Sequence, residues 1–262
     1  MADRALLDRL ERYYDAVPRS AARVESIGPF TLFVREGEGL PYYARPTLGA
    51  AQFAAADVDR VRVRQRRLDV PQAFEWVADT TPALRQAAEA SGVTVHDHPL
   101  LVLQEAREVR NVEGITIRLM RAADVDLARV LAVAQIAFGE PGTHVGEAGI
   151  EALQPVDNTT VTRQGERLQR GLTVTATAFS ESGDPIAVGS HQPVDDVSEI
   201  VGVGTLPAFR RRGIATVLTA VLVADALTRV STVFLSAGDE HVARVYERVG
   251  FRRLATACIA EA

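Results

Sequence analysis

The chain has 262 residues, with 29 basic and 34 acidic side chains and a formal net charge of −5. This acidic balance argues against a nucleic-acid-binding protein, because such proteins usually carry a basic field that meets phosphates. Hydrophobic residues make up 47% of the chain, which is enough for a sizeable core. The length allows one large domain or two small ones.

A single cysteine, Cys258, excludes an intrachain disulfide, so secretion gains no support. Residues 1–16 include acidic side chains and no long apolar core, which argues against a signal peptide. No stretch reaches the ~18 uninterrupted apolar residues of a membrane span. We therefore expect a cytoplasmic protein that does not enter the membrane.

Residues 1–111 alternate helices with strands, the pattern of an α/β layer. Apolar spacing predicts helices, and β-branched or aromatic runs predict strands. The expected helices are 6–16, 54–67 and 82–90, and the expected strands are 30–35, 41–44, 73–77, 93–95 and 99–103.

A polar stretch, residues 106–114, separates two apolar segments, so we expect one domain at 1–111 and another at 112–262. Both end with an amphipathic helix, a glycine (Gly92 or Gly250) and short strands, which suggests an internal duplication. In the second domain we expect helices at 123–137, 145–153, after 210–215 and at 239–249, and strands at 115–119, 172–179, 186–190, 197–205, 232–235 and 251–259.

The segment 199–216 joins a β-branched strand, ended by Pro207, to a helix that opens after three arginines. The first N–H groups of a helix lack partners, and this end carries a partial positive charge. Gly213 allows a ligand to approach the backbone, and Ala215 is nearly as small. The junction therefore fits a diphosphate, although the pattern alone also fits a solvated basic turn before an ordinary helix.

A second motif, residues 239–251, places Val242, Val245, Tyr246 and Val249 on one helix face. Asp239 fits the N-cap of this helix and Gly250 the C-cap. Taken by itself, Tyr246 fits an ordinary core aromatic with a solvated hydroxyl.

Together the two motifs resemble the GNAT acetyltransferase superfamily, over residues 115–262 well and over the first domain only faintly. That family carries Gln/Arg-x-x-Gly-x-Gly/Ala after its fourth strand, and later Asn-x-x-Ala-x-x-x-Tyr-x-x-x-Gly-Phe. The first pattern is filled by Arg210, Gly213 and Ala215, and the second falls on Asp239, Val242, Tyr246, Gly250 and Phe251. Asp239 stands for the usual asparagine and Val242 for the usual alanine, which puts the contact of Asp239 with the cofactor in doubt.

The resemblance implies an α/β (α+β) fold, in which helices flank a mixed central sheet of GNAT type beside a smaller N-terminal α/β domain. It implies acetyl-CoA as co-substrate, with the backbone of Val203 and Thr205 pairing with its pantetheine arm. Tyr246 would protonate the departing thiolate. The diphosphate would be held by the amides of Arg210, Arg211, Arg212, Gly213, Ile214, Ala215 and Thr216.

Glu199 is the candidate general base, because an amine must be neutral to attack a thioester. It stands eleven positions before Arg210, the spacing of a catalytic glutamate in the histone-acetyltransferase branch of the family. Glu199 also fits a surface carboxylate on a strand face. His191, Asp195 and Asp196 lie near in sequence and could share or replace its role.

We expect an N-acetyltransferase that acts on the primary amine of a small molecule. A catalytically weak acyl-CoA-binding or regulatory protein and a protein or peptide acylase are the alternatives. The first domain would be a degenerate GNAT-like unit that shapes the acceptor cleft or forms a homodimer surface. Acceptor specificity would come from residues 138–143 and 172–190 and from this domain. The five histidines and Cys258 form no known metal-ligand pattern, so no metal is expected.

Overall fold

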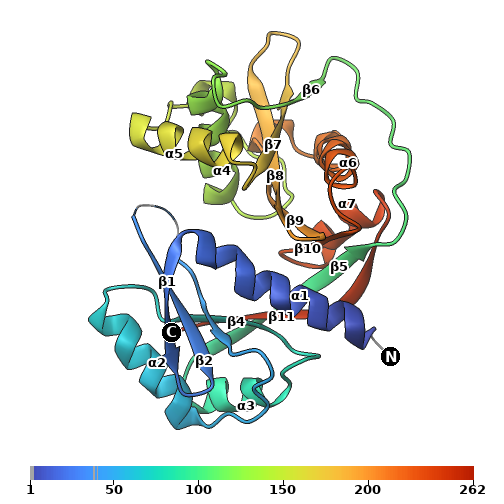
Figure 1. The fold of residues 1–262 in the computed structure, drawn as a ribbon. Coiled ribbons are helices and arrows are strands. Elements are labelled where there is room, and N and C mark those ends of the chain that lie inside the picture. Colours follow the sequence, from blue (N-terminus) through green and yellow to red (C-terminus); the bar gives the residue numbers. More distant parts are fainter. Residues whose placement is uncertain (1–2, 38, 40) are drawn as a thin grey trace. The chain divides into compact units, whose positions relative to one another are not determined.

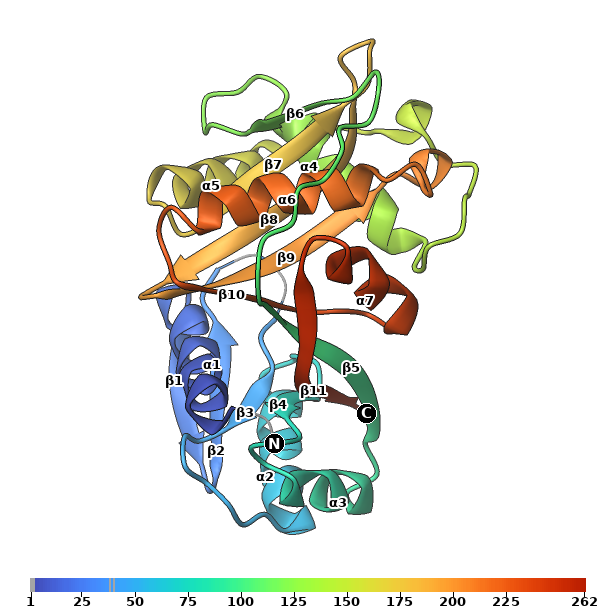
Figure 2. The same cartoon turned by 90° about the vertical axis from the view of Figure 1, so that its right-hand side faces the viewer.

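The computed structural model describes residues 3–37, 39 and 41–262 (Figures 1 and 2). The chain divides into two compact units, Met1–Leu100 with Arg253–Ala262, and Leu101–Arg252. The division differs from the boundary expected at residues 106–114, because the end of the chain lies in the first unit.

The first unit contains a mixed sheet in the order β1-β2-β3-β4-β11-β5. Strands β3 and β4 are parallel, whereas β4 and β11 are antiparallel. Its elements are α1 (Arg4–Ala16), η1 (Val17–Ser20), β1 (Ala22–Ile27), β2 (Phe30–Arg35), β3 (Ala44–Pro46), α2 (Ala55–Arg67), β4 (Ala73–Val77), α3 (Ala83–Ala90), β5 (Thr94–Leu103) and β11 (Phe251–Glu261).

Period-two alternation along these strands builds two faces. Phe30 and Leu32 of β2 and Trp76 of β4 pack in one core with side chains of α2 and α3. The intervening positions contact α1, as shown by the Arg45 guanidinium, which lies over the Tyr14 ring at 4.1 Å.

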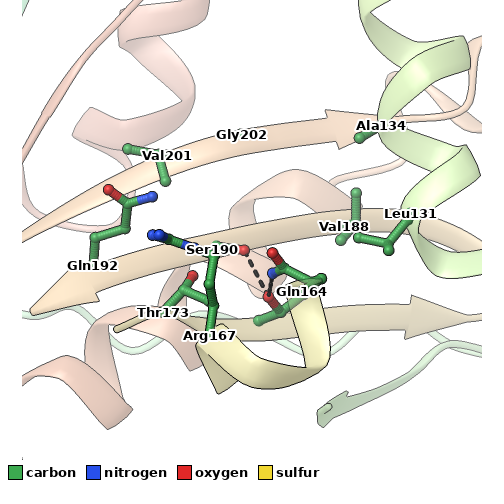
Figure 3. Close-up of a pocket in the computed structure, with 11 residues that line it drawn as sticks. Leu131, Ala134, Gln164, Arg167, Thr173, Val188, Ser190, Gln192, Val201 and Gly202 are labelled. Atoms are coloured by element: carbon green, nitrogen blue, oxygen red, sulfur yellow. Dashed lines mark hydrogen bonds between the residues drawn. The ribbon is translucent and has the colours of Figure 1, made fainter. Parts of the chain in front are cut away.

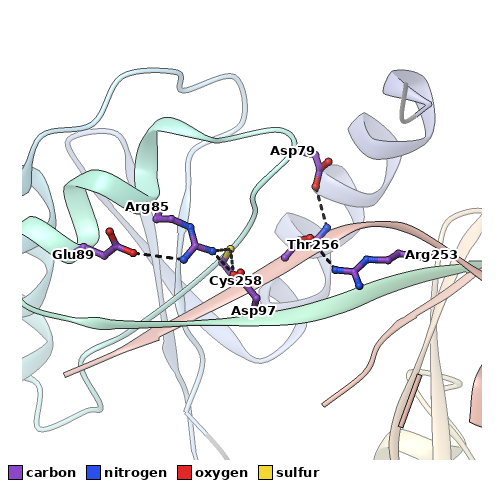
Figure 4. A network of polar contacts seen from close by, with 7 residues as sticks. All are labelled: Asp79, Arg85, Glu89, Asp97, Arg253, Thr256 and Cys258. Atoms are coloured by element: carbon purple, nitrogen blue, oxygen red, sulfur yellow. Dashed lines mark hydrogen bonds and ion pairs between the residues drawn. The ribbon is translucent and has the colours of Figure 1, made fainter. Parts of the chain in front are cut away.

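Strand β11 is held in the first unit by polar contacts as well as by its pairing with β4 (Figure 4). The Thr256 amide donates to Asp79 Oδ2 at 2.9 Å, and the Cys258 thiol lies 3.4 Å from Asp97 Oδ1. Burial raises the pKa of the Cys258 thiol to about 12, and Asp97 contributes in the same direction. The thiol is therefore protonated at neutral pH.

The second unit contains the strand order β10-β9-β8-β7-β6. All neighbours from β6 to β9 are antiparallel, and β9 and β10 are parallel. Its further elements are β6 (Thr116–Leu119), α4 (Leu127–Gly139), η2 (Ile150–Ala152), α5 (Asn158–Gln169), β7 (Val174–Phe179), β8 (Pro185–Val194), β9 (Val197–Thr205), η3 (Pro207–Phe209), α6 (Ile214–Ala226), β10 (Thr232–Ser236) and α7 (Glu240–Glu247).

Helices cover both faces of this sheet: α4 and α5 lie on one face, and α6 lies on the other (Figure 1). The core draws Val130 and Val133 from α4, Leu218 and Leu222 from α6, and the inward residues of the strands. This arrangement is the mixed α/β sheet of GNAT type expected from the sequence.

The same order of elements occurs in both halves: strand, helix, strand, helix, glycine, strand. It runs β3-α2-β4-α3-β5 in the first half and β9-α6-β10-α7-β11 in the second. Gly92 and Gly250 follow α3 and α7 with φ of 81° and 115°, a conformation that favours glycine. The repeated order agrees with the internal duplication inferred from the sequence.

The structure differs from the predicted elements in several places. Strand β1 was not predicted, the strand expected at 41–44 lies at Ala44–Pro46, and the strands expected at 93–95 and 99–103 form the single strand β5. The helix expected at 145–153 is wrong, because only the short η2 forms there, after Gly146 and Gly149. Helix α5 was missed, since its sequence mixes β-branched residues with Gly165, and only the N-cap Asp157 marks its start.

Among the described residues, no helix is long and apolar enough to span a bilayer.

Candidate active site

Strand β9 loses one neighbour halfway along its length. It pairs with parallel β10 only from Val197 to Glu199, opposite Thr232 to Phe234. On its other side, β9 pairs with β8 as far as Thr205. The two parallel strands therefore separate, and the backbone of β9 beyond Glu199 is left without a strand partner on that edge, where an extended ligand can add.

A β-bulge lies in this half of β9. Ser190 of β8 faces Val201, whereas Val188 faces Gly204, so β9 has one extra residue there. Gly202 adopts φ of 63°, a left-handed conformation that glycine accepts without strain. The bulge changes the side-chain alternation: Val201 lines a cavity on the α4–α5 face, and Val203 packs toward Leu218 and Leu222 of α6.

The turn between β9 and α6 leaves backbone amides open. The amide of Arg210 donates to the Pro207 carbonyl, and the amides of Thr216 and Val217 donate to the Gly213 carbonyl. Among the described residues, no acceptor faces the amides of residues 211–215. The N-cap position of α6 is occupied by Gly213, which offers no side-chain cap. These amides and the positive end of α6 form a cradle for an anion.

Gly213 keeps this cradle accessible. It adopts φ of 83°, and a Cβ added there would meet only Val112 Cγ2, at 3.7 Å. Nearby, the buried Thr205 hydroxyl has no hydrogen-bond partner. The residues present therefore fit an acyl-CoA: the amides of residues 211–215 would hold the diphosphate, and the free edge of β9 at Val203 and Thr205 would pair with the pantetheine arm.

The side chain of Arg210 has a different function from the one expected at a diphosphate site. Its guanidinium donates to four main-chain carbonyls, of Ala137 (2.9 Å), Glu140 (2.6 Å), His144 (3.2 Å) and Thr205 (3.2 Å). These contacts use the fork of donors that arginine offers. Arg210 therefore connects the end of α4 and the segment after it to the turn between β9 and α6.

The next two arginines are exposed. Arg211 adopts φ of 66°, an uncommon conformation for a residue other than glycine. The guanidinium of Arg212 lies over the Phe209 ring at 5.0 Å and donates to the Ala208 carbonyl. Both supply positive charge beside the open amides.

Helix α7 carries the other two motif residues. Asp239 is its N-cap, as expected, and accepts from the Val242 amide at 2.8 Å. Tyr246 lies in the core of the second unit, where the centroid of its ring is 6.2 Å from that of the Phe251 ring. Burial raises the pKa of Tyr246 to about 12, so its hydroxyl remains protonated at neutral pH and is able to donate.

Glu199 is half-buried at the point where β9 and β10 separate. Strand alternation places its side chain on the same face as Val201, and it lies directly opposite Gln192 of β8. Val201 and Gln192 both line the cavity described below. Glu199 therefore lies on the face of the sheet that carries this cavity.

Two of the alternatives to Glu199 have structural roles elsewhere. His191 is fully buried on the α6 face, where its ring contacts Ser198 Oγ and Asp225 Oδ2, both at 2.9 Å. Burial lowers the pKa of His191, and Asp225 only partly offsets this. Asp196 accepts from the Ser231 amide at 2.8 Å. Neither lies on the cavity face, and Asp195 occupies the exposed β8–β9 turn.

A cavity of about 190 Å³ lies between the sheet and helices α4 and α5 (Figure 3). One part of its lining is apolar, from Leu131, Ala134, Val188, Val201 and Gly202. The other is polar, from Gln164, Arg167, Thr173, Thr175, Ser190 and Gln192. The cavity reaches the bulge at Gly202 of β9.

The helical part of this lining was not predicted from the sequence. Residues 172–190, to which specificity was assigned, supply Thr173, Thr175, Val188 and Ser190, whereas α4 and α5 were not assigned to the site. The N-cap Asp157 and the spacing of Gln164 and Arg167 could have indicated a helix face.

Among the described residues, no group of three or more His, Cys, Asp or Glu side chains is placed to hold a metal ion.

Comparison with known proteins agrees with this geometry. Residues 149–251 match the acetyltransferase (GNAT) family model. This region is a GNAT domain. No curated protein matches the chain.

Solved structures match both units. A GCN5-related N-acetyltransferase from Kribbella flavida aligns with a TM-score of 0.73 and 20% identity, over 97% of this chain and 95% of its own. Another from Sphaerobacter thermophilus has a TM-score of 0.57 and 20% identity, over 76% and 64%. A tandem GNAT protein from the clavulanic acid biosynthesis pathway has a TM-score of 0.58 and 14% identity, over 92% and 83%. The fold is thus that of GNAT proteins, including one with tandem units.

Proposed function

We propose that this chain is an N-acetyltransferase that transfers an acetyl group from acetyl-CoA to the primary amine of a small molecule. The observation that carries the proposal is the row of open amides at residues 211–215, next to the free edge of β9. The membership of residues 149–251 in the GNAT family supports acyl transfer. A cavity of about 190 Å³ favours a small acceptor over a protein chain.

When bound, the thioester supplies the acyl group, and the protein moves two protons. The carboxylate of Glu199 accepts the proton of the acceptor amine, as the N–C bond forms and the C–S bond breaks. The hydroxyl of Tyr246 donates a proton to the leaving sulfur. The backbone amide near Val203 donates to the carbonyl oxygen, where negative charge develops.

The test is an assay of thiol release with acetyl-CoA and a panel of amines. The chain contains no lysine, so acylation of its own lysine side chains does not add background. Glu199→Gln should lower kcat by ~10²–10⁴-fold, the usual contribution of a general base. Binding of acetyl-CoA, measured by calorimetry, should not change. Glu181→Gln, at the exposed tip of the β7–β8 hairpin, is the matched control.

The outcomes separate the roles. Unchanged kcat in Glu199→Gln would exclude Glu199 as the base. If Tyr246→Phe retained full kcat, the acid would be another group. Tight acetyl-CoA binding with no turnover of any amine would favour the alternative of a binding or regulatory protein.

A further inference from the structure

The space between α4 and the sheet widens along β9 at the bulge. At Gly204 the helix packs closely on the strand, because an added Cβ would lie 2.8 Å from Ala137 Cβ. At Gly202, two positions earlier, no heavy atom of the described residues lies within 4 Å of such a Cβ. Gly202 also lines the cavity of about 190 Å³. The cavity therefore reaches β9 beside Val203, the position proposed for the thioester carbonyl.

One end of the cavity is apolar. Leu131 and Ala134 of α4 lie together there with Val188 of β8 (Figure 3). Val201 adds a further aliphatic side chain from β9. Water gains few hydrogen bonds against such a wall, and a hydrocarbon group that replaces it gains free energy roughly in proportion to the apolar area that it covers. This end of the cavity therefore favours an apolar ligand.

The uncharged polar side chains at the other end already make hydrogen bonds within the protein. Gln164 Nε2 donates to Thr175 Oγ1 at 3.3 Å, and Thr175 Oγ1 lies 2.8 Å from Ser190 Oγ. The Thr173 hydroxyl donates to the His191 carbonyl at 3.4 Å. These groups do not depend on a ligand for their hydrogen bonds, so an apolar ligand leaves none of them without a partner.

The charged side chains on this face of the sheet do not require a charged ligand. Arg167 lines the cavity from α5, and Glu199 lies on the same face of β9. Their charges are opposite in sign, and each has an interaction partner within the protein, as does Gln192. A further charge placed beside aliphatic side chains would cost free energy unless it were paired. A neutral group is therefore favoured at the apolar end.

We infer that this cavity binds an uncharged hydrocarbon group of a substrate, with up to about six carbons. An apolar cavity of about 150 Å³ holds benzene, so about 190 Å³ gives room for a phenyl ring or a short chain. The inference rests on the proposed function and adds selectivity for apolar substrates. Both substrates meet at the thioester carbonyl, so either the acyl chain of the donor or the hydrocarbon part of the amine supplies the group.

The test is calorimetry with two series of compounds, because binding is measured without turnover. The donor series is acetyl-, butyryl- and hexanoyl-CoA. The acceptor series is methylamine, butylamine, hexylamine and benzylamine, each titrated into protein saturated with CoA. In one series, affinity should rise roughly three- to fourfold for each methylene that enters the cavity. The series that shows this rise identifies the substrate that supplies the group.

Substitutions on α4 change the apolar end in opposite directions. Ala134→Leu fills part of it and should lower affinity for the six-carbon compound, relative to the shortest one, about 10- to 60-fold, as expected when two or three methylenes no longer fit. Leu131→Ala enlarges the cavity and should shift the preference toward longer chains. Gln135→Leu, at the next and exposed position of α4, is the matched control and should keep the native preference. Binding of CoA alone shows that each variant is folded.

The inference is wrong if affinity rises with chain length in neither series. It is also wrong if Ala134→Leu changes the preference no more than Gln135→Leu does. A failure of the proposed function looks different, because the calorimetric preference would then be present although no amine is acetylated in the assay of thiol release. In that case the cavity still binds the hydrocarbon group, and only the reaction assigned to the chain is wrong.

Discussion

Helices α2 and α6 occupy the same position in the two halves, each between a pair of parallel strands, but their N-termini differ. At α2, the Asp57 carboxylate accepts from the Ala54 amide at 2.8 Å and places a negative charge at the helix start. At α6, Gly213 precedes the helix, and the amides of residues 211–215 remain open. The first turn of α2 thus carries a carboxylate of its own, whereas the first turn of α6 carries none.

This difference explains how a duplicated fold can retain one cofactor site. A carboxylate at the helix start occupies the place that an anion would take and repels it. Gly213 carries no side chain that would block or repel an anion at the start of α6. The N-terminal half therefore keeps the architecture of a GNAT unit without the cradle, which agrees with its interpretation as a degenerate unit.

The largest effect on stability is expected from Arg210, which holds the open turn of α6 in place. Arg210→Gln removes most of the donors to four carbonyls and should lower the free energy of unfolding by roughly 2–3 kcal/mol. Arg211→Gln, on an exposed side chain, should change it by no more than ~0.5 kcal/mol. Chemical denaturation of both variants measures the difference. Equal effects would mean that the carbonyl contacts of Arg210 do not stabilise the turn.

A smaller effect on stability is expected at α2. Asp57→Ala removes the carboxylate from the start of α2 and should cost about 1 kcal/mol of stability. It should not change acetyl-CoA affinity, because the cradle of the second unit is intact. Denaturation and calorimetry of this variant test both statements. A fall in acetyl-CoA affinity would place part of the site in the first unit.

The smallest effect concerns the far end of α6, where Asp225 meets His191. Because burial lowers the pKa of His191, the folded protein binds a proton there less readily than the unfolded chain, whose histidine titrates near ~6.5. Stability should therefore fall as the pH drops below that value. Melting temperatures of native protein, His191→Gln and the control His241→Gln between pH 5 and 8 measure this. If the melting temperature of His191→Gln falls with decreasing pH as steeply as that of the native protein, other groups cause the pH dependence.

Much of the proposed cofactor site was predictable, because it is contiguous in the chain. The β-branched run, Pro207 and Gly213 gave the bounds of β9 and the start of α6, and the spacing to Asp239 gave the cap of α7. The cavity beneath α4 and α5 was not predictable, because its lining combines these two helices with three strands. Helix α5 owes its stability to packing and capping rather than to intrinsic propensity.

The side chain of Arg210 shows a second limit of the sequence. A motif that fits a diphosphate site identifies the backbone that binds, but not the direction of each side chain. The carbonyls that Arg210 contacts come mostly from residues 137–144, far away in sequence. Only the folded structure brings these groups together.

The most direct test of the account is calorimetry with acetyl-CoA and with S-acetylpantetheine, which lacks the diphosphate. Native protein should bind acetyl-CoA far more tightly, and Gly213→Glu should abolish that preference by placing a carboxylate in the cradle. Gly183→Glu is the matched control, because Gly183 has φ of 81° against 83° for Gly213 and lies in the β7–β8 turn. If Gly213→Glu keeps the native preference, the diphosphate binds elsewhere, and the central claim is contradicted.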